Sequence, residues 1–145
     1  MLEERQVTEL LREKGFKVTP QRLAVYKVLS ATTAHPNAET IYHELQPKYP
    51  TMSLATVYKT LDILSELGLV QVLNVGEESF RYDANTDSHP HVHCMACGRV
   101  DDIFGVDDTD FVERVSSKTA YSLTGKQIYF YGICPDCQKK MKKIH

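Results

Sequence analysis

The chain has 145 residues, of which 42% are hydrophobic and 25% are charged, so it is long enough for one globular domain or two small ones. No apolar run approaches the roughly 18 residues of a membrane span. The N-terminus has no secretory signal pattern, so we expect a cytoplasmic protein. Net charge is −2, and residues 1–67 contain eight basic and eight acidic side chains, so overall charge excludes no partner and favours none.

Four helices are predicted in the first half of the chain. Apolar spacing predicts the first over 3–14, the third ends near Tyr49, and Gly68 closes the fourth over 53–67. The last three each follow a side chain that can cap a helix; these caps are Thr19, Asn37 and Ser53.

Two short strands, Val70–Val75 and Ser79–Tyr82, are predicted around a turn at 76–78. Helices followed by a hairpin are typical of a winged helix-turn-helix domain, in which helix 53–67 would read DNA. The alternative is that the helices form only a structural core and do not bind DNA. Arg22, at a helix start, is a candidate phosphate contact. The candidate DNA-facing positions of helix 53–67 are Ser53, Thr56, Lys59 and Thr60, with Tyr58 able to point either way.

The polar run 83–88 is the predicted hinge, which divides the chain into domains 1–83 and 84–145. The second domain is predicted to be a small α/β domain, so the fold class is α+β. Its predicted elements are a histidine-rich strand, a strand through Val100–Ile103, a helix over Asp107–Lys118 with Phe111 and Val115 inward, a long strand over Tyr121–Gly132 and a short terminal helix.

Two CxxC motifs, formed by Cys94, Cys97, Cys134 and Cys137, predict a metal site. Four thiolates at two knuckles suit tetrahedral Zn²⁺, and a closed site of this kind is structural. The rival is a catalytic redox CxxC, which a thioredoxin-like βαβ context would favour and which this pattern lacks.

Three histidines alternate along the sequence just before the first CxxC motif. In an extended strand His89, His91 and His93 share one face and Cys94 takes the other, so one strand serves two metal sites. Pro90 predicts an edge or a bulge at this end of the strand.

Histidines and carboxylates together suit a reversibly bound divalent ion such as Fe²⁺ or Mn²⁺. The candidates are His89 and His91 on the strand, Asp83 at the hinge and Asp102 on the neighbouring strand. If His35 joins them from the N-terminal half, the metal ties the two halves together.

These motifs together resemble the ferric uptake regulator family over essentially the whole chain. They are Thr19-Pro20-Gln21-Arg22, Ala34-His35-Pro36, Ala55-Thr56-Val57-Tyr58, His89-x-His91-x-x-Cys94-x-x-Cys97 and Cys134-x-x-Cys137. The resemblance implies a dimeric, metal-dependent transcription factor with an N-terminal winged helix and a C-terminal α/β dimerisation domain. It also implies structural zinc on the four cysteines and a regulatory ligand set of His35, Asp83, His89, His91 and Asp102.

At position 102 the chain resembles the peroxide-sensing branch of the family, because it has Asp where iron-sensing members more often have Glu. That branch implies that bound Fe²⁺ reacts with hydrogen peroxide and that His35 and His89 become oxidised. His93 departs from the family pattern and is either an additional ligand or a solvent-facing imidazole. Lys59-Thr60 also departs from it, where that branch has Asn-Asn.

The sequence therefore predicts a homodimeric repressor that binds an AT-rich inverted repeat in double-stranded operator DNA and senses peroxide. The alternative within the family is a repressor that senses iron, manganese or zinc without a peroxide response. Two other classes stay open at this point: a metalloenzyme, whose His/Asp site would turn over a substrate, and a zinc-bound interaction protein that does not bind DNA. We expect no enzymatic activity, because the chain offers no evident substrate domain.

Overall fold

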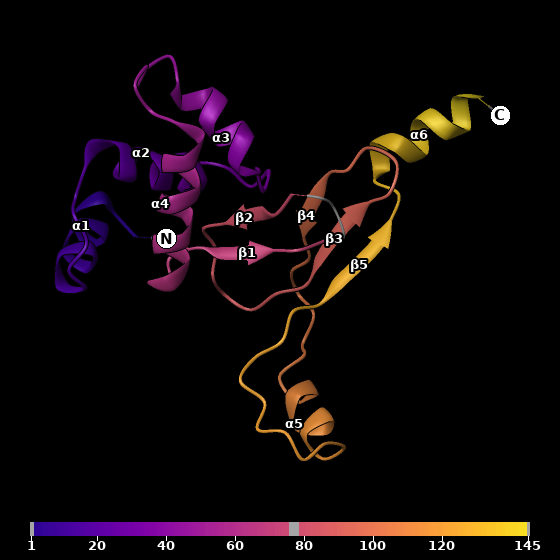
Figure 1. Ribbon diagram of the computed structural model, residues 1–145. Coiled ribbons are helices and arrows are strands. Elements are labelled where there is room, and N and C mark those ends of the chain that lie inside the picture. Colours follow the sequence, from indigo (N-terminus) through magenta and orange to yellow (C-terminus); the bar gives the residue numbers. More distant parts are fainter. Residues whose placement is uncertain (1, 76–78, 145) are drawn as a thin grey trace. The chain divides into compact units, whose positions relative to one another are not determined.

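The computed structural model describes residues 2–75 and 79–144 and divides the chain into two compact units, 1–87 and 88–145 (Figure 1). The boundary between them falls inside the predicted hinge run 83–88. Both units mix helix and sheet, and the fold is α+β as predicted. The DNA-binding role of domain 1–83 and the metal-binding and dimerisation role of domain 84–145 stay predictions.

The first unit begins with four helices, all of which the sequence predicts. They are α1 (Glu4–Glu13), α2 (Pro20–Ser30), α3 (Ala38–Leu45) and α4 (Leu54–Glu66). All three predicted caps are confirmed, because the side chains of Thr19, Asn37 and Ser53 each accept a hydrogen bond from a backbone N–H in the first turn. Gly68, with a φ of 74°, follows the end of α4 in the left-handed conformation that glycine favours.

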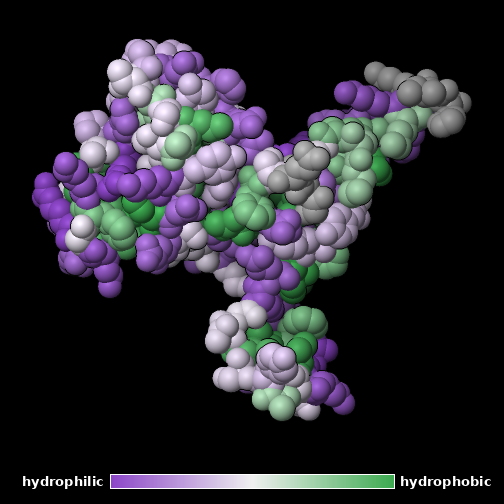
Figure 2. Space-filling model, in the orientation of Figure 1, coloured by the Kyte–Doolittle hydropathy of each residue, from purple (hydrophilic) through white to green (hydrophobic). Residues whose placement is uncertain are grey.

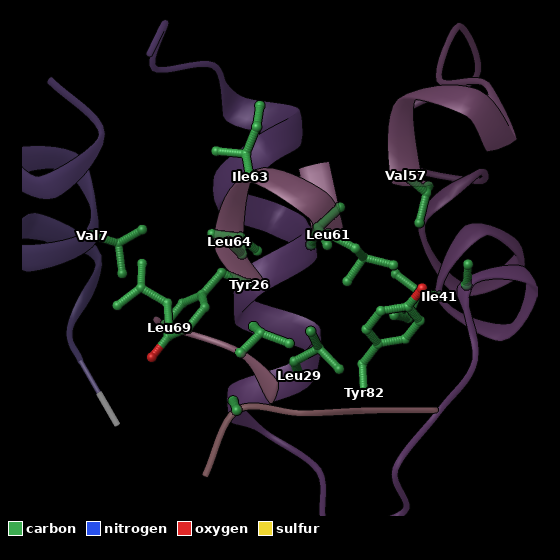
Figure 3. Close-up of a cluster of buried hydrophobic side chains, with 14 of the residues drawn as sticks. Val7, Tyr26, Leu29, Ile41, Val57, Leu61, Ile63, Leu64, Leu69 and Tyr82 are labelled. Carbon is green, nitrogen blue, oxygen red and sulfur yellow. The ribbon is translucent and has the colours of Figure 1, made fainter. Parts of the chain in front are cut away.

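One hydrophobic core holds the four helices together (Figure 3). Leu61 and Leu64 of α4 are almost fully buried, as are Val25 and Leu29 of α2 and Ile41 of α3. These positions recur at helical spacing, so each helix turns one apolar stripe inward. Helix α4 therefore has a fixed orientation, with its opposite side left for solvent or a partner.

A hairpin of β1 (Gln71–Leu73) and β2 (Arg81–Asp83) follows α4. The strands are antiparallel with Val72 opposite Tyr82, and the predicted turn at 76–78 lies outside the described residues. The backbone N–H of Tyr82 donates to the Pro36 carbonyl at 3.1 Å, which attaches the hairpin to the loop before α3. Helices followed by a hairpin attached in this way form the winged helix-turn-helix arrangement.

The second unit contains a three-stranded sheet and two helices. Its elements are β3 (His91–Cys94), β4 (Val100–Asp102), α5 (Phe111–Ser116), β5 (Tyr129–Gly132) and α6 (Pro135–Ile144). The strand order is β4-β3-β5, with β3 antiparallel to β4 and parallel to β5. Both outer strands are therefore edges of this sheet.

Three predictions for the second unit are wrong. Strand β3 is central rather than an edge, because Pro90 precedes the ladder and its missing N–H interrupts no strand pairing. The long strand predicted over 121–132 forms only at its end, since β5 pairs along its length with the four residues of β3. Phe111 and Val115 of α5 are 40% and 39% exposed rather than inward.

Large apolar side chains lie exposed in the second unit. Phe104, Tyr121, Phe130 and Tyr131 are all more than half exposed. Figure 2 shows hydrophobic surface around α5, and Phe130 and Tyr131 belong to the edge strand β5. In the described part of the chain, no helix combines the length and the apolarity that crossing a bilayer requires.

Candidate metal centres

Strand pairing brings the two CxxC motifs together in the second unit. Cys94 ends β3 opposite Gly132 of β5, and the Met95 N–H donates to the Gly132 carbonyl at 2.8 Å. The chain then turns into α6, so Cys134 and Cys137 return to the knuckle that carries Cys97. The parallel β3–β5 pair is what closes the gap of nearly forty residues between the motifs.

The four sulfurs have the spacing of a tetrahedral zinc site. All four lie within 4.8 Å of one another, and Cys97 Sγ is 3.8 Å from Cys134 Sγ. Zn–S bonds of about 2.3 Å place the corners of a tetrahedron about 3.8 Å apart. None of the four is in a disulfide. The four residues therefore suit Zn²⁺ by donor type and by spacing.

The sulfurs also differ in their affinity for protons. Backbone N–H groups, that of Cys134 first and Cys97 next, lower the pKa of the Cys94 thiol to about 6. Hydrogen bonding to the neighbouring sulfurs, Cys134 first, raises the pKa of Cys137 to about 12. Adjacent sulfurs cannot all carry negative charge unaided, and a divalent cation at their centre is what would allow full deprotonation.

Arg99 is a supporting residue that the sequence analysis missed. Its Nε lies 2.7 Å from Asp101 and its Nη1 lies 3.3 Å from Asp136 on α6, while its carbonyl accepts the Cys94 N–H. Arg99 thus joins the first knuckle to the helix that carries the second. A lone exposed arginine in a loop offers no signal of this role in sequence.

A second set of donors converges in the same unit on one carboxylate. Asp102 stands directly opposite His91 across the β3–β4 pair. Its Oδ1 lies 3.1 Å from His91 Nε2 and 2.6 Å from His89 Nε2. The two imidazole rings have centroids 4.4 Å apart, consistent with the predicted shared face. Two imidazole nitrogens and a carboxylate converging in this way are donors that suit a divalent cation.

His93 continues the alternation along β3, where it stands opposite Val100 of β4. Its ring packs edge-on to Tyr131, and the residue is 8% exposed. The solvent-facing alternative is therefore wrong for His93.

The first unit contributes another pair of donors. His35 Nε2 lies 3.2 Å from Asp83 Oδ2, and both side chains are buried. His35 has a φ of 53°, which is rare for a residue other than glycine and costs of order 1–3 kcal/mol. The backbone holds this conformation with help from Arg81, whose Nη1 donates to the His35 carbonyl at 3.1 Å. Asp83 Oδ1 accepts the Asn85 N–H at 2.9 Å, which fixes the carboxylate.

The predicted DNA-facing residues occupy the first two turns of α4 and the start of α2. Lys59 and Ser53 are exposed and Tyr58 is 41% exposed, whereas Thr56 is only half-exposed. Thr60, which the sequence predicts to be exposed, is 1% exposed, because its hydroxyl donates to the Thr56 carbonyl and its side chain faces the core. Separately, Arg22 is half-buried and its Nη1 donates to the Lys17 carbonyl at 2.7 Å.

Comparison with known proteins agrees with this geometry. The model of the Ferric uptake regulator family matches residues 13–131. The chain belongs to the ferric uptake regulator family. It is 55% identical over 134 residues to "Transcriptional regulator PerR" of Clostridium acetobutylicum, covering 92% of this chain and 97% of that one. It is 40% identical over 131 residues to "Peroxide-responsive repressor PerR" of Staphylococcus saprophyticus, covering 90% and 88%.

Solved structures of the ferric uptake regulator family share the fold. The Helicobacter pylori ferric uptake regulator, described as having three functional metal-binding sites, matches with a TM-score of 0.78 at 24% identity, covering 92% of this chain and 90% of that one. The Campylobacter jejuni peroxide stress regulator matches with a TM-score of 0.68 at 32% identity, covering 94% and 100%.

Proposed function

We propose that the protein is a metal-dependent DNA-binding repressor that senses hydrogen peroxide through oxidation of the histidines that bind its metal. The observation that carries the proposal is the convergence of His89 and His91 on Asp102 Oδ1. An aspartate with two imidazoles forms an open-sided donor set that leaves room for further ligands. The names of the relatives from Clostridium and Staphylococcus, which are regulators, support a transcriptional role over an enzymatic one.

Two kinds of ion are proposed, one for the four cysteines and one for the histidines and aspartates. The four cysteines bind structural Zn²⁺. The regulatory ion is Fe²⁺ or Mn²⁺, because imidazole and carboxylate donors suit these ions better than thiolates do. The proposed regulatory ligands are His35, Asp83, His89, His91 and Asp102.

One regulatory ion would bind donors from both units. Of the five proposed ligands, the first unit supplies two and the second supplies three, and each number is below the octahedral preference of such ions. An ion that takes His35 and Asp83 together with the donors of the second unit restricts the relative orientation of the winged helix. Coupling between two such sites is commonly worth about 1–3 kcal/mol, which changes DNA affinity by about 5- to 150-fold.

The peroxide response depends on which side chains stand beside the ion. Fe²⁺, when bound, supplies one-electron reduction of peroxide, and Mn²⁺ is a poor reductant of it. The imidazoles of His35 and His89 are the proposed sites of oxidation, as the family resemblance implies. An oxidised imidazole is a poorer metal ligand. Oxidation would therefore release the ion, and the protein would lose the orientation that binds DNA.

DNA recognition is assigned to helix α4, with Tyr58 and Lys59 exposed on it. Ser53 caps its N-terminus and Thr56 lies in its first turn, and Arg22 is the proposed phosphate contact. The partner is operator DNA, proposed to be an AT-rich inverted repeat, because a symmetric dimer places two reading helices on two half-sites. Binding to operator DNA would place the protein in the cytoplasm.

The homodimer is proposed to form through the second unit. Strand β5 is the outer strand of the described three-stranded sheet, and it carries Phe130 and Tyr131, which are 53% and 59% exposed. An exposed apolar edge strand in a soluble protein marks an association surface.

Peptide mass spectrometry after mild peroxide treatment tests the proposal. Protein loaded with iron is compared with protein loaded with manganese, which is the matched control. We expect one added oxygen on the peptides that contain His35 or His89 with iron only, together with loss of operator binding. Unmodified histidines and unchanged DNA affinity in the iron-loaded protein would overturn the peroxide function and leave the alternative, a metal-sensing repressor.

A further inference from the structure

Phe104 lies two residues beyond Asp102, just after β4, and its side chain is unusually exposed for a phenylalanine. The residue is 67% exposed, yet its ring centroid lies 5.2 Å from that of His89, with the planes tilted by 32°. This distance is in the range of aromatic pairs that attract beyond simple burial. The contact that Phe104 makes within the second unit is therefore directed at a proposed metal ligand.

Of the three proposed ligands in this unit, His89 is the one that lies outside the β-strands. It precedes β3, whereas His91 is paired with Asp102 across the sheet and donates its backbone N–H to the Ile128 carbonyl. The orientation of the His89 ring therefore depends on side-chain contacts. Three of these are the carboxylate of Asp102 at 2.6 Å, the ring of His91 at 4.4 Å and the ring of Phe104.

We propose that Phe104 is a positioning residue, which holds the His89 imidazole toward Asp102 and covers part of its surface. The inference rests on the proposed function for its consequence in oxidation, whereas the ring contact between Phe104 and His89 is a feature of the structure itself. A phenyl ring on the imidazole restricts rotation about χ2, which is otherwise a broad torsion in histidine. Phe104 would thus raise metal affinity and increase the share of peroxide oxidation that falls on His89.

The first experiment uses full-length protein that retains its structural zinc but has no ion at the proposed regulatory site. Carbethoxylation of histidines is followed by peptide mass spectrometry, with exposed His43 on α3 as the internal reference. In Phe104→Ala we expect His89 to react about 2- to 10-fold faster, the factor that corresponds to the strength of an aromatic pair. Phe104→Tyr should restore the parent rate. Tyr121→Ala, which removes an aromatic ring that is 81% exposed, is the matched control and should leave it unchanged.

The second experiment measures Mn²⁺ binding and, with iron, the distribution of added oxygen. We expect Phe104→Ala to bind Mn²⁺ about 2- to 10-fold more weakly and to shift oxidation from His89 toward His35, with rescue by Phe104→Tyr. Parent-like His89 reactivity or parent-like Mn²⁺ affinity in Phe104→Ala would overturn the positioning role. If the parent protein itself shows no histidine oxidation, the peroxide function fails, whereas the metal-free rates and Mn²⁺ affinities still decide the role of Phe104.

Discussion

Zinc should hold the second unit together to a degree that its apolar residues cannot. Among its described residues, the buried apolar side chains are Pro90, Val100 and the two cysteines Cys94 and Cys137. Fully burying one valine contributes about 1.5–3 kcal/mol. Structural Zn²⁺ contributes about 10–16 kcal/mol in zinc-finger peptides. The first unit, by contrast, has the continuous core of Figure 3.

Cys97→Ser is the perturbation of choice, because Cys97 is exposed and its loss disturbs little packing. Release of the ion would remove its whole contribution to folding, about 10–16 kcal/mol on the scale of zinc-finger peptides. We expect loss of zinc and rapid hydrogen exchange throughout the sheet of the second unit, while helices α1–α4 keep their protection. Hydrogen exchange with mass spectrometry reads the two units separately, and a chromogenic chelator reports the zinc.

Met95→Ser is the matched control, since Met95 lies in the same knuckle, is 63% exposed and offers no strong ligand. It should retain zinc and parent-like exchange. The reasoning is refuted if Cys97→Ser keeps one zinc per chain, or if zinc-free protein retains the protection of the second unit.

Three further predictions concern binding and assembly. Arg22→Ala should weaken binding to all DNA sequences about equally and reduce the salt slope of the binding constant by about one, measured by fluorescence anisotropy; a changed sequence preference at parent affinity would contradict the phosphate contact. Asp102→Glu adds a methylene beside two imidazoles, so metal-dependent DNA binding should persist while peroxide releases the DNA more slowly in a gel-shift time course; an unchanged response would remove Asp102 from that role. Phe130→Asp should raise the dimer dissociation constant at least about tenfold in sedimentation, by charging an exposed edge strand, whereas an unaltered dimer would place the interface elsewhere.

Local sequence signals determined most of the first unit. Thr19, Asn37 and Ser53 cap their helices through their own side chains, and Gly68 ends α4 because it tolerates positive φ. These interactions span only a few residues, so they can be recognised without knowing the rest of the fold. The third helix ends earlier than predicted, at Leu45, and turns that hydrogen-bond to its carbonyl carry the chain to Tyr49.

The proposed metal ligands could also be recognised in the sequence, because their chemistry shows in residue type and spacing. The CxxC pairs and the alternation of His89 with His91 are visible in one sequence, and the structure brings the four sulfurs together. Their role as ligands of particular ions stays a proposal. The contacts around them were not predictable, because Arg99 and Phe104 contact residues that are distant in sequence and that the fold brings near.

The second unit shows what only tertiary structure decided. The segment 121–132 is rich in Tyr, Ile and Phe, yet β5 forms only at its end, where β3 offers backbone partners. The spacing of Phe111 and Val115 predicts an inward face, but a helix buries a face only where another element covers it, and α5 leaves both side chains exposed. Periodicity determines which residues can share a face, whereas the partners that cover that face depend on contacts far apart in sequence, which no local pattern encodes.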